Sequence, residues 1–339
     1  MRTTAVGSAI RAASLGLAFA LIFAWLTPAE SGELPKIQAT LASVNGPEFI
    51  TARAEMLFAK KVREKTNGGL SINVVLAGAL GGMKETLEAI ADGNLQFSQA
   101  TNSSLGALYG GTLLFDLPFL FRDNDHMRRV VRGPIGQQVY AELEKRTGIK
   151  MLMAGMADGP RSVYNNRRPV RVVADLKGMK LRVPEALVTI DTFKALGAIT
   201  TPMAYPEVYM AAKQGVIDGA ETPLSALLDI RAPEVAKYYS LTKHNDTPVG
   251  VGVNAKWFGG LPKAYQDAIM EAGNEARLWH DSEFETICAA ALAEAKRMGM
   301  QVNDIADIEE FRKAVEPVYA KYADRVGGRK LIQAVIDTK

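Results

Sequence analysis

Apolar and polar residues follow changing patterns over residues 176–223, and these patterns predict an alternation of strands and helices. Residues 179–183 alternate apolar with cationic side chains, as a half-buried strand does, and Pro184 ends the strand because it has no backbone N–H to donate. Apolar residues then recur at helical spacing over residues 187–196, and Gly197 suits the cap of that helix. The next predicted elements are a strand at residues 199–203, a helix from Pro206 to Gly215 and a strand that begins at Val216.

This order of elements predicts an open parallel α/β sheet, because short links join strand, helix, strand, helix and strand. Such sheets bind ligands in the crevice beyond the carboxyl ends of their strands. Arg182, Glu221 and Thr222 all lie at such ends. Position alone also fits an arginine that is exposed to solvent at the rim of the sheet, so both interpretations stay open at this point.

The part of the chain that follows residue 31 predicts the same order of elements. Strands are expected at residues 36–43, 70–76 and 95–101, with helices at residues 47–66 and 83–92. Both segments also share a short pattern before a strand, Glu85-x-x-x-Ala89-x-x-x-Gly93 and Glu207-x-x-x-Ala211-x-x-x-Gly215. Chance similarity between two glycine-capped helices also explains so short a match. Together with the common element order, however, it favours two similar α/β lobes that face each other across a cleft.

Other segments connect the two lobes or follow them. The strongly apolar residues 113–121 predict a turn buried under the first lobe, and the glycine-rich residues 154–160 predict a crossing between lobes. Residues 262–298 predict a nearly continuous helix, which either bends near Gly273 or lies straight across both lobes. The remaining predicted elements are a helix at residues 134–146, strands at residues 149–153 and 247–253, a helix at residues 308–325 and a short terminal helix.

Residues 1–31 have the composition of a secretory signal peptide. Arg2 and Arg11 supply positive charge, an apolar run follows them, and cleavage is expected before Gly32. An uncleaved membrane anchor is the alternative, but the run is shorter than the roughly 20 apolar residues that a span needs. The remaining chain of about 308 residues exceeds one comfortable hydrophobic core. We therefore expect one lobe from residues 32–158 with about 248–288, and a second from residues 159–247 with about 289–339.

Composition and motifs exclude several classes of function. The 40 Lys and Arg residues nearly balance the 37 Asp and Glu residues, and no basic run with interleaved aromatic residues predicts nucleic-acid binding. Cys288 is the only cysteine, and its apolar neighbours predict a buried thiol. The sequence has no G-x-S-x-G or H-E-x-x-H motif, and its three histidines are far apart, so we do not expect an enzyme. The glycines at residues 250–252 are followed by Lys-Trp-Phe instead of a phosphate-binding helix, which argues against a dinucleotide site.

Several short motifs resemble one protein family. They are FAxxV at residues 58–62, TxG at 66–68, LG at 80–81, DLKGMKLRVP at 175–184, GA at 197–198, PM at 202–203, EVY at 207–209 and DGAE at 218–221. In these motifs the chain resembles the solute-binding proteins of tripartite ATP-independent periplasmic (TRAP) transporters, in the DctP family. The resemblance covers essentially the whole chain after residue 31.

The resemblance implies a type II periplasmic binding protein fold, in which two α/β lobes enclose a ligand cleft and a long helix crosses both. It also implies a function in the periplasm, where the protein captures a carboxylate-bearing organic acid and delivers it to a small and a large membrane subunit. The acid is expected to be a dicarboxylate, a hydroxy or keto acid, or a sugar acid. We expect a monomer without a cofactor or metal. The alternative is a ligand-sensing module that presents its bound form to a signalling receptor.

The resemblance also assigns residues to the ligand site. The family's carboxylate-binding arginine falls on Arg182, whose planar guanidinium matches the two oxygens of a carboxylate. A second arginine falls on Arg161, and Glu221 and His244 match a network that braces Arg182. The further candidate contacts are Thr222, Tyr205, Thr101, Asn102 and Ser43, the last two because they lie at strand ends.

The same positions narrow the choice of ligand. Members specialised for sialic acid carry acidic residues where this chain has Thr101 and Met83, so that sugar acid is not expected. Members that bind keto acids with a metal often carry tryptophan at the position of Thr222, which makes metal-assisted binding doubtful although Glu221 is present. Tyr205 occupies a position from which an aromatic ring packs on the ligand or simply fills the core.

Overall fold

The computed structural model describes residues 34–339, and the predicted signal peptide at residues 1–31 lies outside them. The strands are β1 (Ile37–Ala42), β2 (Leu70–Val75), β3 (Phe97–Thr101), β4 (Ile149–Asn165), β5 (Lys180–Val183), β6 (Ile199–Pro202), β7 (Gly219–Pro223), β8 (Tyr238–Asn254) and β9 (Gln301–Asp304). The α-helices are α1 (Ile50–Lys65), α2 (Met83–Ala91), α3 (Asn102–Leu105), α4 (Asn124–Arg132), α5 (Pro134–Thr147), α6 (Leu187–Ala195), α7 (Val208–Lys213), α8 (Ala232–Val235), α9 (Ala255–Gly259), α10 (Lys263–Arg297), α11 (Ile308–Ala314), α12 (Glu316–Tyr322) and α13 (Arg329–Asp337). The 3₁₀ segments are η1 (Gly110–Asp116), η2 (Val173–Leu176), η3 (Tyr205–Glu207) and η4 (Leu224–Ala226).

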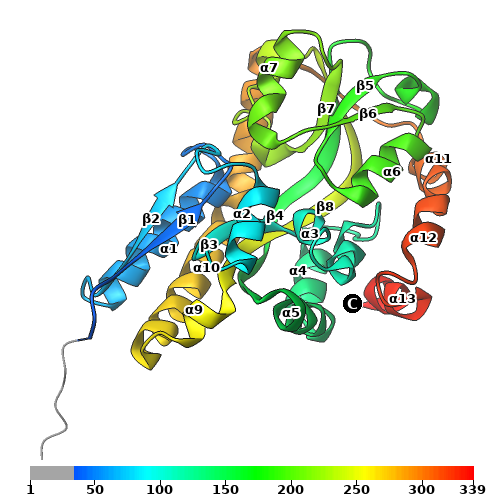
Figure 1. The fold of residues 1–339 in the computed structure, drawn as a ribbon. Coiled ribbons are helices and arrows are strands. Elements are labelled where there is room, and N and C mark those ends of the chain that lie inside the picture. The colour runs from blue at the N-terminus through cyan, green and yellow to red at the C-terminus, as the bar shows by residue number, and fades with distance from the viewer. Residues whose placement is uncertain (1–33) are drawn as a thin grey trace, which may run out of the picture. The chain divides into compact units, whose positions relative to one another are not determined.

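The strands form one mixed sheet whose two ends build two lobes (Figure 1). The order is β2-β1-β3-β8-β4-β7-β5-β6, and β9 pairs with β8. We call β1, β2 and β3 with α1, α2 and the segments between them the first lobe, and β5, β6 and β7 with α6, α7, α8 and the segments between them the second lobe. Within each lobe the strands are parallel, as the sequence predicts, whereas β3–β8, β4–β7 and β4–β8 are antiparallel.

The two lobes are joined by β4 and β8, which are each 17 residues long. The sequence predicts only residues 149–153 and 247–253 as strands, so both predictions are too short. The segment at 154–160 is not a loop but part of β4, with irregular pairing to β8 on either side of Met156 and Ala157. Gly155 and Gly159 have positive φ angles of 76° and 90° at these irregularities. The glycines that signal a turn in the sequence therefore form β-bulges, which bend a strand without ending it.

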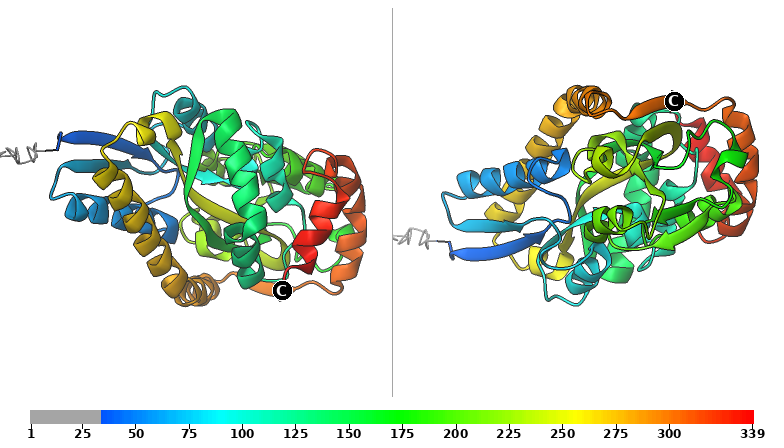
Figure 2. Two further views of the ribbon diagram at one scale, coloured as in Figure 1. Left: turned by 90° about the horizontal axis from the view of Figure 1, so that it is seen from below. Right: turned by 90° about the horizontal axis from the view of Figure 1, so that it is seen from above.

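Helix α10 is continuous over its 35 residues and has a length of about 52 Å. Figure 2 shows it running from the side of α1 and β2 along the molecule. Its buried residues belong to different hydrophobic clusters in turn, with Ile269 beside the first lobe, Phe284 in the middle and Ala295 beside the second lobe. Gly273 lies inside the helix, where a side chain would come 3.3 Å from Met153. The helix therefore has no break at Gly273 and reaches from the first lobe to the second, although Figure 2 shows that its last turns run in another direction than its first ones.

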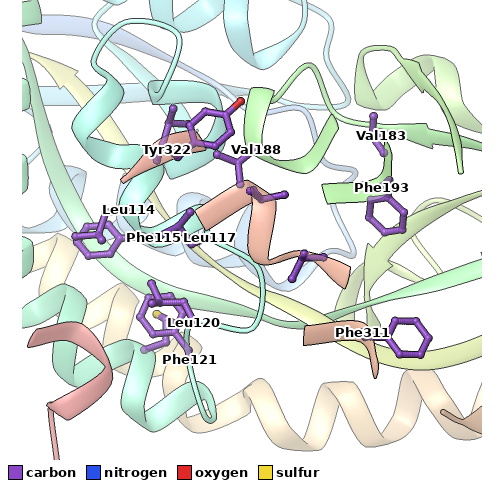
Figure 3. Close-up of a cluster of buried hydrophobic side chains, with 14 of the residues drawn as sticks. Leu114, Phe115, Leu117, Leu120, Phe121, Val183, Val188, Phe193, Phe311 and Tyr322 are labelled. Atoms are coloured by element: carbon purple, nitrogen blue, oxygen red, sulfur yellow. The ribbon is translucent and has the colours of Figure 1, made fainter. Parts of the chain in front are cut away.

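The largest hydrophobic cluster contains the apolar segment at residues 113–121 (Figure 3). The prediction that this segment is buried is confirmed, since Leu114 and Phe115 have no exposed surface. The segment packs against more of the protein than predicted, because the same cluster includes Phe193 of α6 and Phe311 of α11. The segment therefore packs under the second lobe as well, and the exact division of residues between lobes stays a prediction.

Smaller predictions are confirmed or corrected by the same structure. Gly93 and Gly215 end α2 and the helix α7 with positive φ angles of 81° and 74°, as the shared pattern predicts. The strand expected from Val216 begins later, at Gly219. The helix expected at 308–325 is divided, because α12 begins at Glu316 with Pro317 in its first turn. Cys288 is buried as predicted. Among residues 34–339, no helix is both long enough and apolar enough to span a membrane.

Candidate functional site

A cavity lies between the two lobes, beyond the carboxyl ends of β1, β3, β5 and β6. It contains about 850 Å³ of space not occupied by protein atoms, part of which is open to solvent. Small-molecule sites are typically about 300 to 1,000 Å³. Both lobes and the crossing strand β4 contribute to the wall. The polar wall residues that the following paragraphs use are Asn45, Lys84, Thr101, Asp158, Arg161, Arg182 and Tyr205.

Arg182 is a buried cation on the second-lobe side of this cavity. It is the third residue of β5, and only 3% of its surface is exposed. Its guanidinium donates from Nε and Nη2 to the backbone oxygen of Met203, at 3.0 and 2.8 Å. No ion pair among residues 34–339 includes Arg182. Burial lowers the pKa of Arg182, and the nearby charge of Glu221 offsets part of that effect. The side chain therefore presents a desolvated positive charge to the cavity.

Arg161, by contrast, is paired within the protein. Its Nε lies 2.5 Å from Oε2 of Glu221 and its Nη2 lies 2.7 Å from Oε1, which is a bidentate arrangement. Although burial raises the pKa of Glu221, the Arg161 charge and a hydrogen bond from His244 hold it well below its usual value. The positive charge of Arg161 is thus largely neutralised by Glu221.

His244 completes this network from β8. Its Nε2 lies 3.2 Å from Oε2 of Glu221, and its Nδ1 lies 2.9 Å from Oγ1 of Thr242. Burial lowers the pKa of His244, so the ring is neutral at ordinary pH. Because an ionised carboxylate only accepts, the proton belongs on Nε2, and Nδ1 accepts from Thr242. The histidine fixes Glu221 without adding charge.

The sequence-based assignment of Glu221 and His244 as braces of Arg182 is corrected by these contacts, because they hold Arg161. The strand register explains the difference. Arg161 is opposite Pro223, so Glu221, two residues earlier in β7, points to the same face of the sheet as Arg161. Arg182 is opposite Ala220 and therefore points to the other face. Glu221 reaches Arg182 only through the long-range electrostatic effect on its pKa.

A second polar network connects the lobes beside the cavity. The hydroxyl of Tyr205 donates to Oδ2 of Asp229 at 2.8 Å, within the second lobe. Oδ1 of Asp229 accepts from the backbone N–H of Gly46 at 3.1 Å, and Gly46 follows β1 of the first lobe. Burial raises the pKa of Asp229, and the hydrogen bonds from Tyr205, Gly46 and Asn45 oppose that rise. Asp229 therefore ties the two lobes together in this conformation.

The remaining predicted contacts divide into two groups. Thr101 and Tyr205 line the cavity. Thr222, Asn102 and Ser43 are all at least 98% buried and are not part of its wall. The amide of Asn102 instead contacts the backbone oxygen of Pro248 and the hydroxyl of Tyr140. The roles of all these residues stay predictions.

Sequence reasoning missed several polar groups of the cavity wall, among them Asn45, Lys84 and Asp158. Asn45 lies three residues beyond the end of β1, a position that the rule for strand ends identifies as a candidate. Lys84 is the second residue of α2, at the cavity rim, and no comparable pattern in the sequence identifies it. Asp158 was missed because it lies in the glycine-rich segment at residues 154–160, which the sequence predicts as a crossing between the lobes. Among residues 34–339, no group of three or more His, Cys, Asp or Glu side chains is placed to hold a metal ion.

Similar proteins fit this architecture. A solute-binding protein of Verminephrobacter eiseniae is 34% identical over 276 residues, which cover 81% of this chain and 82% of that protein. The 2,3-diketo-L-gulonate-binding periplasmic protein of Escherichia coli is 32% identical over 235 residues, with 68% of this chain and 71% of that protein covered. A TRAP periplasmic solute-binding protein of Roseobacter denitrificans, solved with bound β-D-glucuronate, is 30% identical with a TM-score of 0.86. The match covers 89% of this chain and 100% of that one.

A cleft between two α/β lobes that are joined by long strands, with a buried arginine in its wall, defines a solute-binding protein. Residues 41–325 match the bacterial extracellular solute-binding proteins of family 7, DctP, and the chain belongs to that family. Its role is that of the solute-binding component of a TRAP transporter.

Proposed function

We propose that this protein binds a hydroxylated monocarboxylic acid in the periplasm, with Arg182 as the residue that holds the carboxylate. The observation that supports this role is a desolvated guanidinium at the wall of the interlobe cavity that has no acidic partner among residues 34–339. A buried cation of this kind costs free energy unless an anion compensates it. A ligand carboxylate supplies that compensation and two acceptor oxygens for the planar donor group.

The charge balance of the cavity favours one carboxylate over two. Arg161 is already paired with Glu221, so Arg182 is the buried arginine of the wall that lacks an acidic partner. Lys84 is exposed at the rim and offers a hydrated charge rather than a desolvated one. The other polar groups of the wall, among them Asn45 and Thr101, suit hydroxyl groups.

The ligands of similar proteins support the same class. The Roseobacter denitrificans protein was solved with β-D-glucuronate, and a TRAP periplasmic solute-binding protein of Polaromonas with D-erythronate. The latter is 29% identical, has a TM-score of 0.85 and covers 89% of this chain and 99% of that one. Both ligands carry one carboxylate and several hydroxyl groups, although a relative of Bacillus subtilis is a C4-dicarboxylate-binding protein.

In the proposed cycle the open lobes admit the anion, and contacts from both lobes then favour the closed form by the difference in affinity between the two states. The closed form delivers the acid to a small and a large membrane subunit. The protein acts as a monomer and catalyses no reaction on its ligand. The tie from Gly46 to Asp229 is one contact that the closed form gains.

The proposal is tested by the Arg182→Ala variant of the protein without residues 1–31. A thermal-shift screen of sugar acids, hydroxy acids, keto acids and dicarboxylates first identifies a ligand, and isothermal titration calorimetry then compares the variants. We expect Arg182→Ala to lose about 2 to 5 kcal/mol of binding free energy, since the ligand carboxylate loses its charged partner in a desolvated site.

Arg297→Ala is the matched control, because Arg297 is an exposed arginine that pairs with Glu294 at the far end of α10. This variant should bind like the unmodified protein. Near-normal affinity in the Arg182→Ala protein would refute the assignment. A screen in which no carboxylic acid raises the melting temperature would refute the proposed class of ligand.

A further inference from the structure

Asp158 occupies an unusual position in the cavity wall. It lies in β4 at an irregularity of the pairing with β8, between Ala157 and Pro160. A bulge of this kind redirects a side chain out of the regular alternation of a strand. The next residue, Gly159, has a φ angle of 90°, and a Cβ there would lie 2.8 Å from the ring of Phe284. The backbone that presents Asp158 to the cavity therefore depends on glycine at position 159.

The carboxylate of Asp158 is buried but only partly used by the protein. It is 7% exposed, and its Oδ1 accepts from the hydroxyl of Thr51 at 3.1 Å. Oδ2 accepts no hydrogen bond from residues 34–339 and is not sealed from the cavity that Asp158 lines. The backbone oxygen of Asp158 is held separately by the hydroxyl of Ser225 at 2.6 Å. A fixed acceptor oxygen thus faces the space that a ligand would occupy.

We propose that Asp158 determines specificity by accepting a hydrogen bond from a hydroxyl group of the bound acid. This inference rests on the proposed function and adds the residue that separates hydroxylated acids from dicarboxylates. A hydroxyl donates to a carboxylate, whereas a second ligand carboxylate only accepts and is repelled by the same charge. Arg182 would bind the carboxylate of the ligand, and Asp158 would accept a hydrogen bond from a hydroxyl group elsewhere in the same ligand.

Two other interpretations are less consistent with the contacts. A ligand ammonium group also donates to a carboxylate, but the desolvated charge of Arg182 lies in the same cavity wall, so another cation meets repulsion. A purely structural role would use Asp158 only to hold the start of α1 through Thr51. That role leaves Oδ2 at the cavity wall without a function.

Burial raises the pKa of Asp158 to about 6, while the Arg161 charge and the Thr51 hydrogen bond oppose the rise.

The test measures selectivity in the Asp158→Asn variant by calorimetry. The probes are D-glucuronate, D-erythronate, succinate and butanoate, the last two being acids without hydroxyl groups. Affinity for the hydroxylated probes should fall roughly tenfold to a hundredfold, because a hydrogen bond to a charged acceptor is lost. Affinity for succinate should stay the same or rise, since the new amide can donate to its second carboxylate. The ratio of the two affinities is a readout that a merely structural role would not change.

Thr51→Val distinguishes a structural role of Asp158 from a role in ligand binding, because it removes the donor to Oδ1 and leaves the cavity-facing oxygen in place. Thr51→Val should therefore keep the selectivity of the unmodified protein. This expectation can be tested even if Asp158→Asn folds poorly. An unchanged affinity ratio in Asp158→Asn, or the same loss of selectivity in Thr51→Val, would overturn the role of Asp158 and leave the proposed function standing. Tighter binding of succinate, butanoate or a 2-amino acid than of both hydroxylated probes by the unmodified protein would also overturn it. The Arg182→Ala variant tests the proposed function independently, because that function requires the variant to bind more weakly whatever the role of Asp158 is.

Discussion

Glu55 of α1 is the clearest case of a single residue whose protonation state is set by the fold. It has no exposed surface, and neither carboxyl oxygen has a hydrogen-bond partner among residues 34–339. Burial raises its pKa from 4.5 to about 8, with the nearby hydroxyl of Ser43 opposing the rise and the charge of Asp158 adding to it. Glu55 is therefore protonated in the folded protein at neutral pH, because an ionised carboxylate in this position would lack compensation.

The raised pKa predicts that the Glu55→Gln variant gains stability relative to the unmodified protein as the pH rises. The unfolded chain releases the Glu55 proton near pH 4.5, whereas the folded chain keeps it until about pH 8. Rising pH between these values therefore favours the unfolded state. Glutamine has nearly the same shape and no proton to release. Between pH 5 and pH 8 the variant should gain about 3 kcal/mol relative to the unmodified protein, from roughly 1.4 kcal/mol per pH unit.

Urea unfolding followed by circular dichroism at pH 5, 6.5 and 8 measures this difference. Comparing the two proteins at each pH cancels the effects of the other buried carboxyl groups, including Asp116 and Asp246. Glu64→Gln is the matched control, because Glu64 is an exposed carboxylate on the same helix. A stability difference between Glu55→Gln and the unmodified protein that does not change with pH would contradict the prediction.

At this scale the sequence identified Arg182 and Arg161 but not how they differ. Both arginines line the cavity, yet one is paired in a bidentate manner and the other is not. The difference depends on which strands are neighbours and on their register, since β7 lies between β4 and β5. A single sequence does not contain that information explicitly. Glu55 was missed for a related reason, because a glutamate in an amphipathic helix is ordinarily exposed.

At the scale of elements, the loop after β1 contacts the second lobe through a glycine. The backbone N–H of Gly46 donates to Asp229, and a Cβ at Gly46 would lie 2.7 Å from Oδ1 of the same carboxylate. Asp229 cannot turn away without losing its hydrogen bond from Tyr205. The contact between these two elements therefore requires that position 46 has no side chain.

Gly46→Ala should weaken ligand binding by about 1 to 3 kcal/mol, because it breaks hydrogen bonds to a charged group that favour the closed lobes. Calorimetry with the ligand from the screen measures the loss. Gly82→Ala is the control at a second interlobe contact, where the new Cβ meets Ala204 at an ordinary 3.4 Å and the end of the exposed Glu85 side chain can move. Equal affinities of the two variants would argue against the Gly46–Asp229 contact as part of closure.

The elements themselves were largely predictable where their signals are local. Periodicity and glycine caps predicted β5, α6 and α2, because side-chain alternation and cap geometry are set by neighbouring residues. The crossing strands β4 and β8 were predicted too short. Gly155 and Gly159 fit a turn as well as a bulge, and only pairing with a strand about ninety residues away decides between the two.

At the scale of the whole molecule, the lobes meet at the rim of the cavity around Gly82 and Ala204. Gly82 precedes α2 of the first lobe, and Ala204 precedes η3 of the second. A Cβ at Gly82 would lie 3.4 Å from the Cβ of Ala204, close to the roughly 3.5 to 4.5 Å that a disulfide requires. Both residues have φ angles that cysteine adopts readily, −72° and −62°. A pair of cysteines at these positions can therefore join the lobes covalently.

The Gly82→Cys/Ala204→Cys double variant should bind its ligand only when reduced. Oxidation before the ligand is added would hold the lobes together, so the acid cannot enter a cavity that opens by separating them. Cys288 should not interfere, because burial raises the pKa of its thiol to about 12 and an unreactive thiol does not exchange. Stopped-flow fluorescence with and without a reductant measures the rate of ligand entry, and the two single variants control for the cysteines themselves. A fully oxidised double variant that takes up ligand as fast as the reduced one would show that entry does not require the lobes to part.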